Sequence, residues 1–136
     1  MNPTLRNILA VLAGLIAGSI VNGTLISISG SVIPPPPGVD PSDMESLKAG
    51  IHLFEAKHFV FPFLAHALGT LAGALIASLI GVSKRMVLAL VVSGLFLLGG
   101  IGAAFIIPAP AWFIALDLLA AYIPMALLGW KLSGRP

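Results

Sequence analysis

The chain has 136 residues, of which 58% are hydrophobic and only 9% are charged. Soluble domains carry charges at about a quarter of their positions, so this composition excludes an ordinary soluble domain and indicates a protein embedded in lipid. The net charge of +2 is too small and too dispersed to indicate a nucleic-acid partner, and the lack of cysteine excludes disulfides, thiolate metal sites and cysteine nucleophiles.

Four apolar stretches are long enough to cross a bilayer, which takes about 20 mainly apolar residues per helix. They cover about residues 5–29, 59–82, 86–107 and 112–132. The first is too long for the apolar region of a signal peptide and has no clear cleavage site, so we expect it to be a helix of the mature protein. The sequence therefore predicts an all-α fold, with residues 1–136 forming one transmembrane four-helix bundle.

The basic residues predict the orientation of these spans. With four spans, the N-terminus, the second connection and the C-terminus share one side of the membrane. That side carries five basic residues and the other side carries two, and cytoplasmic segments are enriched in Lys and Arg. We therefore expect both termini in the cytoplasm and the protein in the inner (plasma) membrane of a cell. The five residues are Arg6, Lys84, Arg85, Lys131 and Arg135, and the two are Lys48 and Lys57.

The outer loop, about residues 31–58, has features of its own. Four consecutive prolines favour a stiff polyproline II segment. Ser42 and Glu45 then fit a capping box, with Asp40 as an alternative N-cap. Apolar residues follow at helical spacing and predict an amphipathic outer helix before the second span; they are Met44, Leu47, Ile51 and Phe54.

The end of this outer helix is open from sequence. It either lies on the membrane surface or runs directly into the second span. In the second case Pro62 would kink or break the joined helix, because proline has no backbone N–H to donate. Gly50 is a weaker break point.

Small residues recur every four positions in the first two spans. Helices in lipid associate through close packing and hydrogen bonds, and small side chains permit the close approach. We therefore expect these two spans to cross along their small faces, inside one bundle rather than between copies. The first face contains Ala10, Gly14 and Gly18 and continues to Asn22; the second contains Ala65, Gly69, Gly73, Ala77 and Gly81.

Three polar residues of three different spans fall at a similar depth in the outer half of the membrane, namely Asn22, His66 and Asp117. An ionisable side chain at such a depth is costly and usually faces the bundle interior beside a partner. We therefore predict a buried polar cluster in which His66 pairs with Asp117 and Asn22 completes the group. A purely structural hydrogen bond is an equally good interpretation of the pair.

A metal site is a further hypothesis. On one continuous helix, Glu55, His58 and His66 would share a face with the small residues of the second span. Imidazole and carboxylate are usual ligands of a divalent metal such as zinc, which makes Glu55, His58, His66 and Asp117 candidate ligands. The alternative is that Glu55 and His58 mark the solvated end of a helix. Tyr122 and Pro124 are interpreted as packing residues.

Two segments, GSVIPPPPGVDPSDMESLKAGIHLFEAKHFVFPFLAHALGTLAGA and PAPAWFIALDLLAAYIPM, cover much of the chain. They resemble small four-span bacterial membrane proteins that are uncharacterised. The resemblance implies a four-span fold and brings no activity, substrate or site residue with it.

Three functions fit the sequence. The first is a self-assembling or accessory subunit of a membrane complex, with the lipid bilayer and another membrane protein or a second copy as partners. The second is an oligomeric proton- or cation-coupled transporter or channel component in which Asn22, His66 and Asp117 form the proton or cation site. The third is a metal-binding protein or enzyme. Enzyme activity has the least support, because the chain has no Gly-x-Ser-x-Gly elbow and no phosphate-binding Gly-rich loop.

Overall fold

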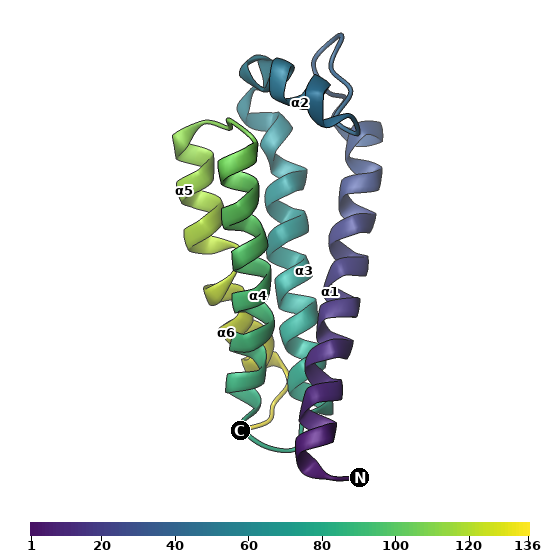
Figure 1. Ribbon diagram of the computed structural model, residues 1–136, viewed down its shortest axis with the longest axis vertical. Coiled ribbons are helices and arrows are strands. Elements are labelled where there is room, and N and C mark those ends of the chain that lie inside the picture. Colours follow the sequence, from purple (N-terminus) through teal and green to yellow (C-terminus); the bar gives the residue numbers. More distant parts are fainter.

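The computed structural model describes residues 1–136, and all of its regular structure is helical (Figure 1). Four helical segments of 30, 25, 22 and 22 residues are long and apolar enough to cross a membrane. The structure therefore supports a multi-pass membrane protein. The helices are α1 (Pro3–Val32), α2 (Met44–Gly50), α3 (Val60–Ile80), α4 (Arg85–Ile106), α5 (Ala111–Ala120) and α6 (Ile123–Leu132).

The two ends of the bundle carry different parts of the chain. Both termini lie at one end, here called the terminal end, and α2 with its loop lies at the other, called the loop end (Figure 1). At the terminal end, Asn7 joins α1 to the connection before α4. Its Oδ1 accepts a hydrogen bond from the Val82 N–H at 3.0 Å, and its Nδ2 donates to Ser83 Oγ at 2.9 Å.

Helices α1 and α3 cross at backbone contact through their small faces. A Cβ atom added to Gly14 would lie 2.5 Å from the Gly73 carbonyl oxygen, and one added to Gly18 would lie 2.6 Å from that of Gly69. Real Cβ atoms do not come so close to a carbonyl oxygen, so only glycine permits this crossing. The expected approach of the first two spans is therefore present within a single chain.

Beyond this crossing the two helices separate toward the loop end (Figure 1). Gly23 and Gly30, also on α1, are exposed and lie off the face that meets α3; a Cβ added to either would meet no atom within 4 Å. The bundle is thus tight near the crossing and opens between α1 and α3 at the loop end.

The terminal half of the bundle is filled by small side chains. Ala74, Ala89 and Ala126, from α3, α4 and α6, pack together with no exposed surface. Gly129 of α6 lies against the backbone of α3, where an added Cβ would be 2.6 Å from the Leu71 carbonyl oxygen. Close backbone packing leaves little free space in this half.

The start of α2 differs from the expected capping box. Asp43 is the N-cap, and its Oδ1 accepts the Glu45 N–H at 3.2 Å. Ser42 instead donates its hydroxyl to Asp40 Oδ1 at 2.6 Å. The hydrogen bonds from the Ser42 hydroxyl and N–H lower the pKa of Asp40 below its ordinary value, because they favour the ionised carboxylate.

The outer helix is not continuous with the second span. Helix α2 ends at Gly50, and two 3₁₀ turns, Ile51–Leu53 and Ala56–Phe59, precede α3. Gly50 is pressed against the Val39 side chain, where a Cβ would collide with it. Pro62 lies in the first turn of α3, where a missing N–H costs no helical hydrogen bond.

An aromatic cluster holds this connecting segment on the bundle. The ring of Phe59 stacks on Phe113 of α5, with centroids 4.5 Å apart, and meets Trp112 edge to face at 5.5 Å. Leu47, Ile51 and Phe54 also join this cluster. The segment is therefore attached to α5 rather than lying free on a membrane surface.

The fourth span is also interrupted, between α5 and α6. Ala121 and Tyr122 lie outside both helices, and Tyr122 has φ −116° and ψ −81°. Pro124 has no N–H to donate to the carbonyl four residues earlier, so the helix cannot continue through it unbroken. The break turns Tyr122 into the bundle, where only 3% of it is exposed.

The α1–α3 crossing predicts a contrast between two substitutions on one helix. Gly14→Ala should lower the free energy of unfolding in mixed micelles by about 1–3 kcal/mol, the usual cost of overpacking. Gly23→Ala is the matched control and should be neutral or stabilising by up to about 1 kcal/mol, because alanine is the better helix former. Equal effects of the two substitutions would contradict the crossing.

A cavity and a buried polar group at the loop end

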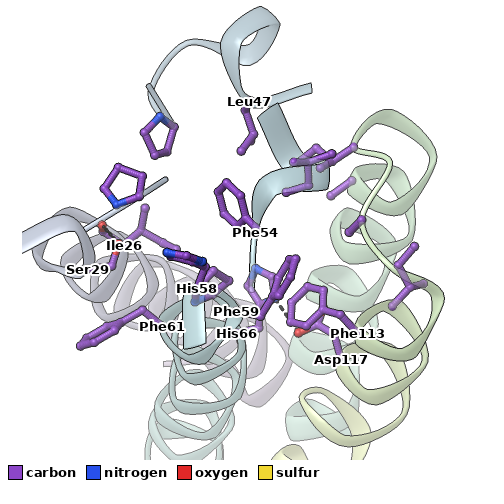
Figure 2. A pocket seen from close by; sticks show the side chains of 18 of the residues that line it. Ile26, Ser29, Leu47, Phe54, His58, Phe59, Phe61, His66, Phe113 and Asp117 are labelled. Carbon is purple, nitrogen blue, oxygen red and sulfur yellow. Dashed lines mark hydrogen bonds and ion pairs between the residues drawn. The ribbon is translucent and has the colours of Figure 1, made fainter. Parts of the chain in front are cut away.

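His66 of α3 and Asp117 of α5 form the central contact of the candidate site. His66 Nδ1 lies 2.8 Å from Asp117 Oδ1, and a dashed line marks this contact in Figure 2. The Asp117 side chain is 7% exposed and the His66 side chain is 29% exposed. The carboxylate is therefore the buried member of the pair, and the imidazole is the member that an incoming molecule can reach.

Two hydroxyl groups complete the hydrogen bonding around this pair. The Tyr122 hydroxyl donates to Asp117 Oδ2 at 3.5 Å, and the Tyr122 and His66 rings stack with centroids 5.9 Å apart. Thr70 Oγ1 donates to the His66 carbonyl oxygen at 2.8 Å. Asp117 thus accepts on both oxygens, as a buried carboxylate requires.

Above the pair lies a cavity of about 270 Å³, which we call the loop-end cavity. Its walls come from α1, α3, α4 and α5, and its roof comes from α2 and the residues around it. Figure 2 shows Phe54, Phe59 and Phe113 on one side of this space and Ile26 and Ser29 on the other. Fourteen of its 24 lining residues are hydrophobic, so it favours an apolar occupant with few polar groups.

A second cavity of about 190 Å³, the inner cavity, lies between α1, α3 and α4. His66, Gly100 and Ala103 line both cavities, so the two adjoin. Asn22 also lines the inner cavity, and its buried Oδ1 has no hydrogen-bond partner. The structure thus brings His66 and Asp117 together, and it places Asn22 at the inner cavity without a hydrogen bond to either of them.

The four candidate metal ligands do not converge. Glu55 is exposed and pairs with Lys57 at 3.3 Å, while the Glu55 N–H donates to His58 Nδ1 at 2.8 Å. No three His, Asp or Glu side chains come together in a group that could hold a metal ion. The physical reason is the break after Gly50: Glu55 and His58 precede α3 and do not share a helix face with His66.

Tyr122 is the member of the site that the sequence interpretation missed. The sequence alone suggests a packing residue of the fourth span. The interruption before Pro124 instead places its hydroxyl on Asp117 and against Gly100, where a Cβ would collide with it. Pro124 was the available signal, because a proline inside an apolar span marks a position where the backbone can turn.

Comparison with known proteins gives no relative for this site: no family model, no curated protein and no solved structure matches the chain. The fold itself defines the class, a small all-helical protein with four apolar segments of membrane-spanning length.

The His66–Asp117 pair can be tested by a double-mutant cycle with His66→Ala and Asp117→Ala. Interhelical hydrogen bonds in membrane proteins average about 0.6 kcal/mol in such cycles. A 2.8 Å contact to a carboxylate is charge-assisted, so we expect a coupling of about 1–2 kcal/mol in the free energy of unfolding.

The matched control is the cycle of Tyr122→Phe with Asp117→Ala. It should give a smaller coupling, because the hydroxyl is 3.5 Å from the carboxylate. Zero coupling between His66 and Asp117 would contradict the contact.

Proposed function

We propose that this protein binds a small amphipathic molecule within the membrane, with the apolar part in the loop-end cavity and the polar part at His66. The observation that carries this proposal is the position of the polar pair. The two ionisable residues of α3 and α5 meet beside a largely apolar cavity of about 270 Å³. Ligand sites typically combine apolar walls with a few convergent polar groups.

The size of the cavity suits a modest ligand. An engineered apolar cavity of about 150 Å³ holds benzene, and the loop-end cavity has about 270 Å³ with the inner cavity beside it. A substituted ring or a short branched chain is therefore a fitting occupant. The separation of α1 from α3 at this end supports entry from the surrounding lipid.

Binding is favoured over catalysis by the state of the nearby hydroxyl groups. Ser29 Oγ donates to the Ile26 carbonyl oxygen at 2.9 Å, and Thr70 Oγ1 donates to that of His66. Neither is hydrogen-bonded to the imidazole, as a base-activated nucleophile would be.

Transport through a single chain has less support. Both cavities lie toward the loop end, and the terminal half is packed by Ala74, Ala89 and Ala126. Ser78 donates there to the Arg85 carbonyl oxygen, and the Ser93 hydroxyl is buried without a partner. A continuous polar route would need more groups than these.

We further propose that the terminal end faces the cytoplasm and the loop end faces outward, in a plasma membrane. The excess of Lys and Arg at the terminal end supports this orientation. Because the chain has no cysteine, labelling a single Ser133→Cys from each side of the membrane tests it. If Ser133→Cys is labelled by a reagent added outside the cell, the proposed orientation is wrong.

Self-assembly is a second proposal, and one observation favours it. Gly94 and Gly102 of α4 face open space, since an added Cβ at either would meet nothing within 4 Å. Glycine on an outward face allows another helix to approach closely. Native mass spectrometry should then find more than one copy per particle, with fewer in Gly94→Leu; single copies throughout would remove this proposal.

The binding proposal predicts that filling the loop-end cavity with a larger side chain weakens ligand binding. Ala104 of α4 lines the cavity, so Ala104→Phe should place a ring in it and weaken binding of 4-hexylphenol at least about tenfold, equivalent to about 1.4 kcal/mol. Binding is measured in lipid nanodiscs against empty nanodiscs.

The same substitution at an exposed position of α5, Ala115→Phe, is the control and should bind as the wild type does. No binding above empty nanodiscs by the wild type, or equal binding by the wild type and Ala104→Phe, would contradict the proposal.

A further inference from the structure

The inner cavity has an imbalance of hydrogen-bonding groups. Asn22 Oδ1 is a buried acceptor without a donor. The Thr70 hydroxyl donates to the His66 carbonyl oxygen, and the Tyr122 hydroxyl donates to Asp117 Oδ2. Both of these buried donors are thus committed elsewhere, and the third hydroxyl of the lining, that of Ser19, belongs to an exposed residue. A buried acceptor left unpaired costs about 1–3 kcal/mol.

His66 adds a second acceptor at the same place. An ionised carboxylate only accepts hydrogen bonds, so the contact with Asp117 assigns the proton of the neutral imidazole to Nδ1. Its Nε2 then carries a lone pair. His66 lines both cavities, so it is the polar residue that a ligand extending from one cavity into the other would pass.

The inner cavity also lacks any fixed charge. Its twelve lining residues include no Asp, Glu, Lys or Arg, and Asp117 lines only the loop-end cavity. A carboxylate group would therefore enter a membrane-embedded space near the like-charged Asp117. An ammonium group would meet Asp117 only behind His66 and Tyr122, which already occupy its oxygens, and a charged group at this depth is costly. The polar group that fits is neutral.

We propose that the inner cavity is a subsite for a neutral hydroxyl group, which donates a hydrogen bond to Asn22 Oδ1 when the amide turns from its buried position toward the cavity, so that the ligand is an apolar alcohol or phenol. Its hydrocarbon part occupies the loop-end cavity and its hydroxyl passes His66 into the inner cavity. This inference rests on the proposed binding function and specifies its ligand class. Asn22 is then the residue that distinguishes hydroxyl ligands from ligands without a donor.

The test compares two probes of nearly equal shape, 4-hexylphenol and its methyl ether, 4-hexylanisole. The ether keeps the ring, the chain and the oxygen but has no donor. Binding is measured in lipid nanodiscs and corrected for partition into empty nanodiscs. The wild type should bind the phenol about 5- to 10-fold more tightly, the worth of one neutral hydrogen bond.

Asn22→Leu should reduce this ratio to about one while leaving the ether's affinity within about twofold, since only the acceptor is lost. Asn22→Ala gives the same readout if the larger leucine side chain disturbs the neighbouring Gly69, which Asn22 contacts closely. Ser27→Ala is the control, because Ser27 lies on the same helix, is exposed and lines neither cavity, so it should leave the ratio unchanged.

The outcomes distinguish failure of the hydroxyl subsite from failure of the binding function on which it rests. Equal binding of both probes by the wild type, or tighter binding of the ether, overturns the hydroxyl subsite and leaves the cavity proposal standing. A preference for the phenol that persists in both Asn22 variants overturns the role of Asn22. If neither probe binds, the proposed function fails together with the subsite.

Discussion

The contact between the backbones of α1 and α3 determines where the rest of the bundle can open. Gly14 and Gly18 meet Gly73 and Gly69 so closely that no side chain fits between them. On the terminal side of this contact the two helices stay together, because Ala10 packs with Ala77 and Arg6 Nε donates to the Ile80 carbonyl oxygen at 3.0 Å. At the terminal end the Asn7 hydrogen bonds join α1 to the connection before α4. The separation is therefore left at the loop end, where both cavities lie.

The polar pair depends on this geometry as well. A buried carboxylate in a membrane needs hydrogen-bond donors from neighbouring helices, and Asp117 receives them from α3 and from Tyr122. Both oxygens of Asp117 already accept hydrogen bonds. The polar side chains that remain available to a ligand are therefore those of His66 and Asn22. These two residues line the space that the diverging helices leave, so the crossing places polar side chains next to free volume.

The sequence predicted those parts of the structure that follow from composition and regular spacing. The four spans, the α1–α3 crossing and the level shared by His66 and Asp117 all depend on counting residues along regular helices, and counting is accurate within an unbroken helix. Counting residues gave wrong positions where a helix was interrupted. The break after Gly50 displaced Glu55 and His58 from the face of His66, and that single error produced the four-ligand metal hypothesis.

The interruptions have local causes that a helical wheel omits. At Gly50 the cause is contact with Val39 from a proline-rich segment, and a loop's packing partner cannot be read from spacing. At Tyr122 the cause is Pro124 downstream, which was visible, but the direction in which the backbone turns depends on the neighbouring α4. Gly100 provides the space for the Tyr122 hydroxyl. One glycine and one proline on different helices thus bring a second donor to Asp117, and the site requires both helices to be in place before either residue's role can be recognised.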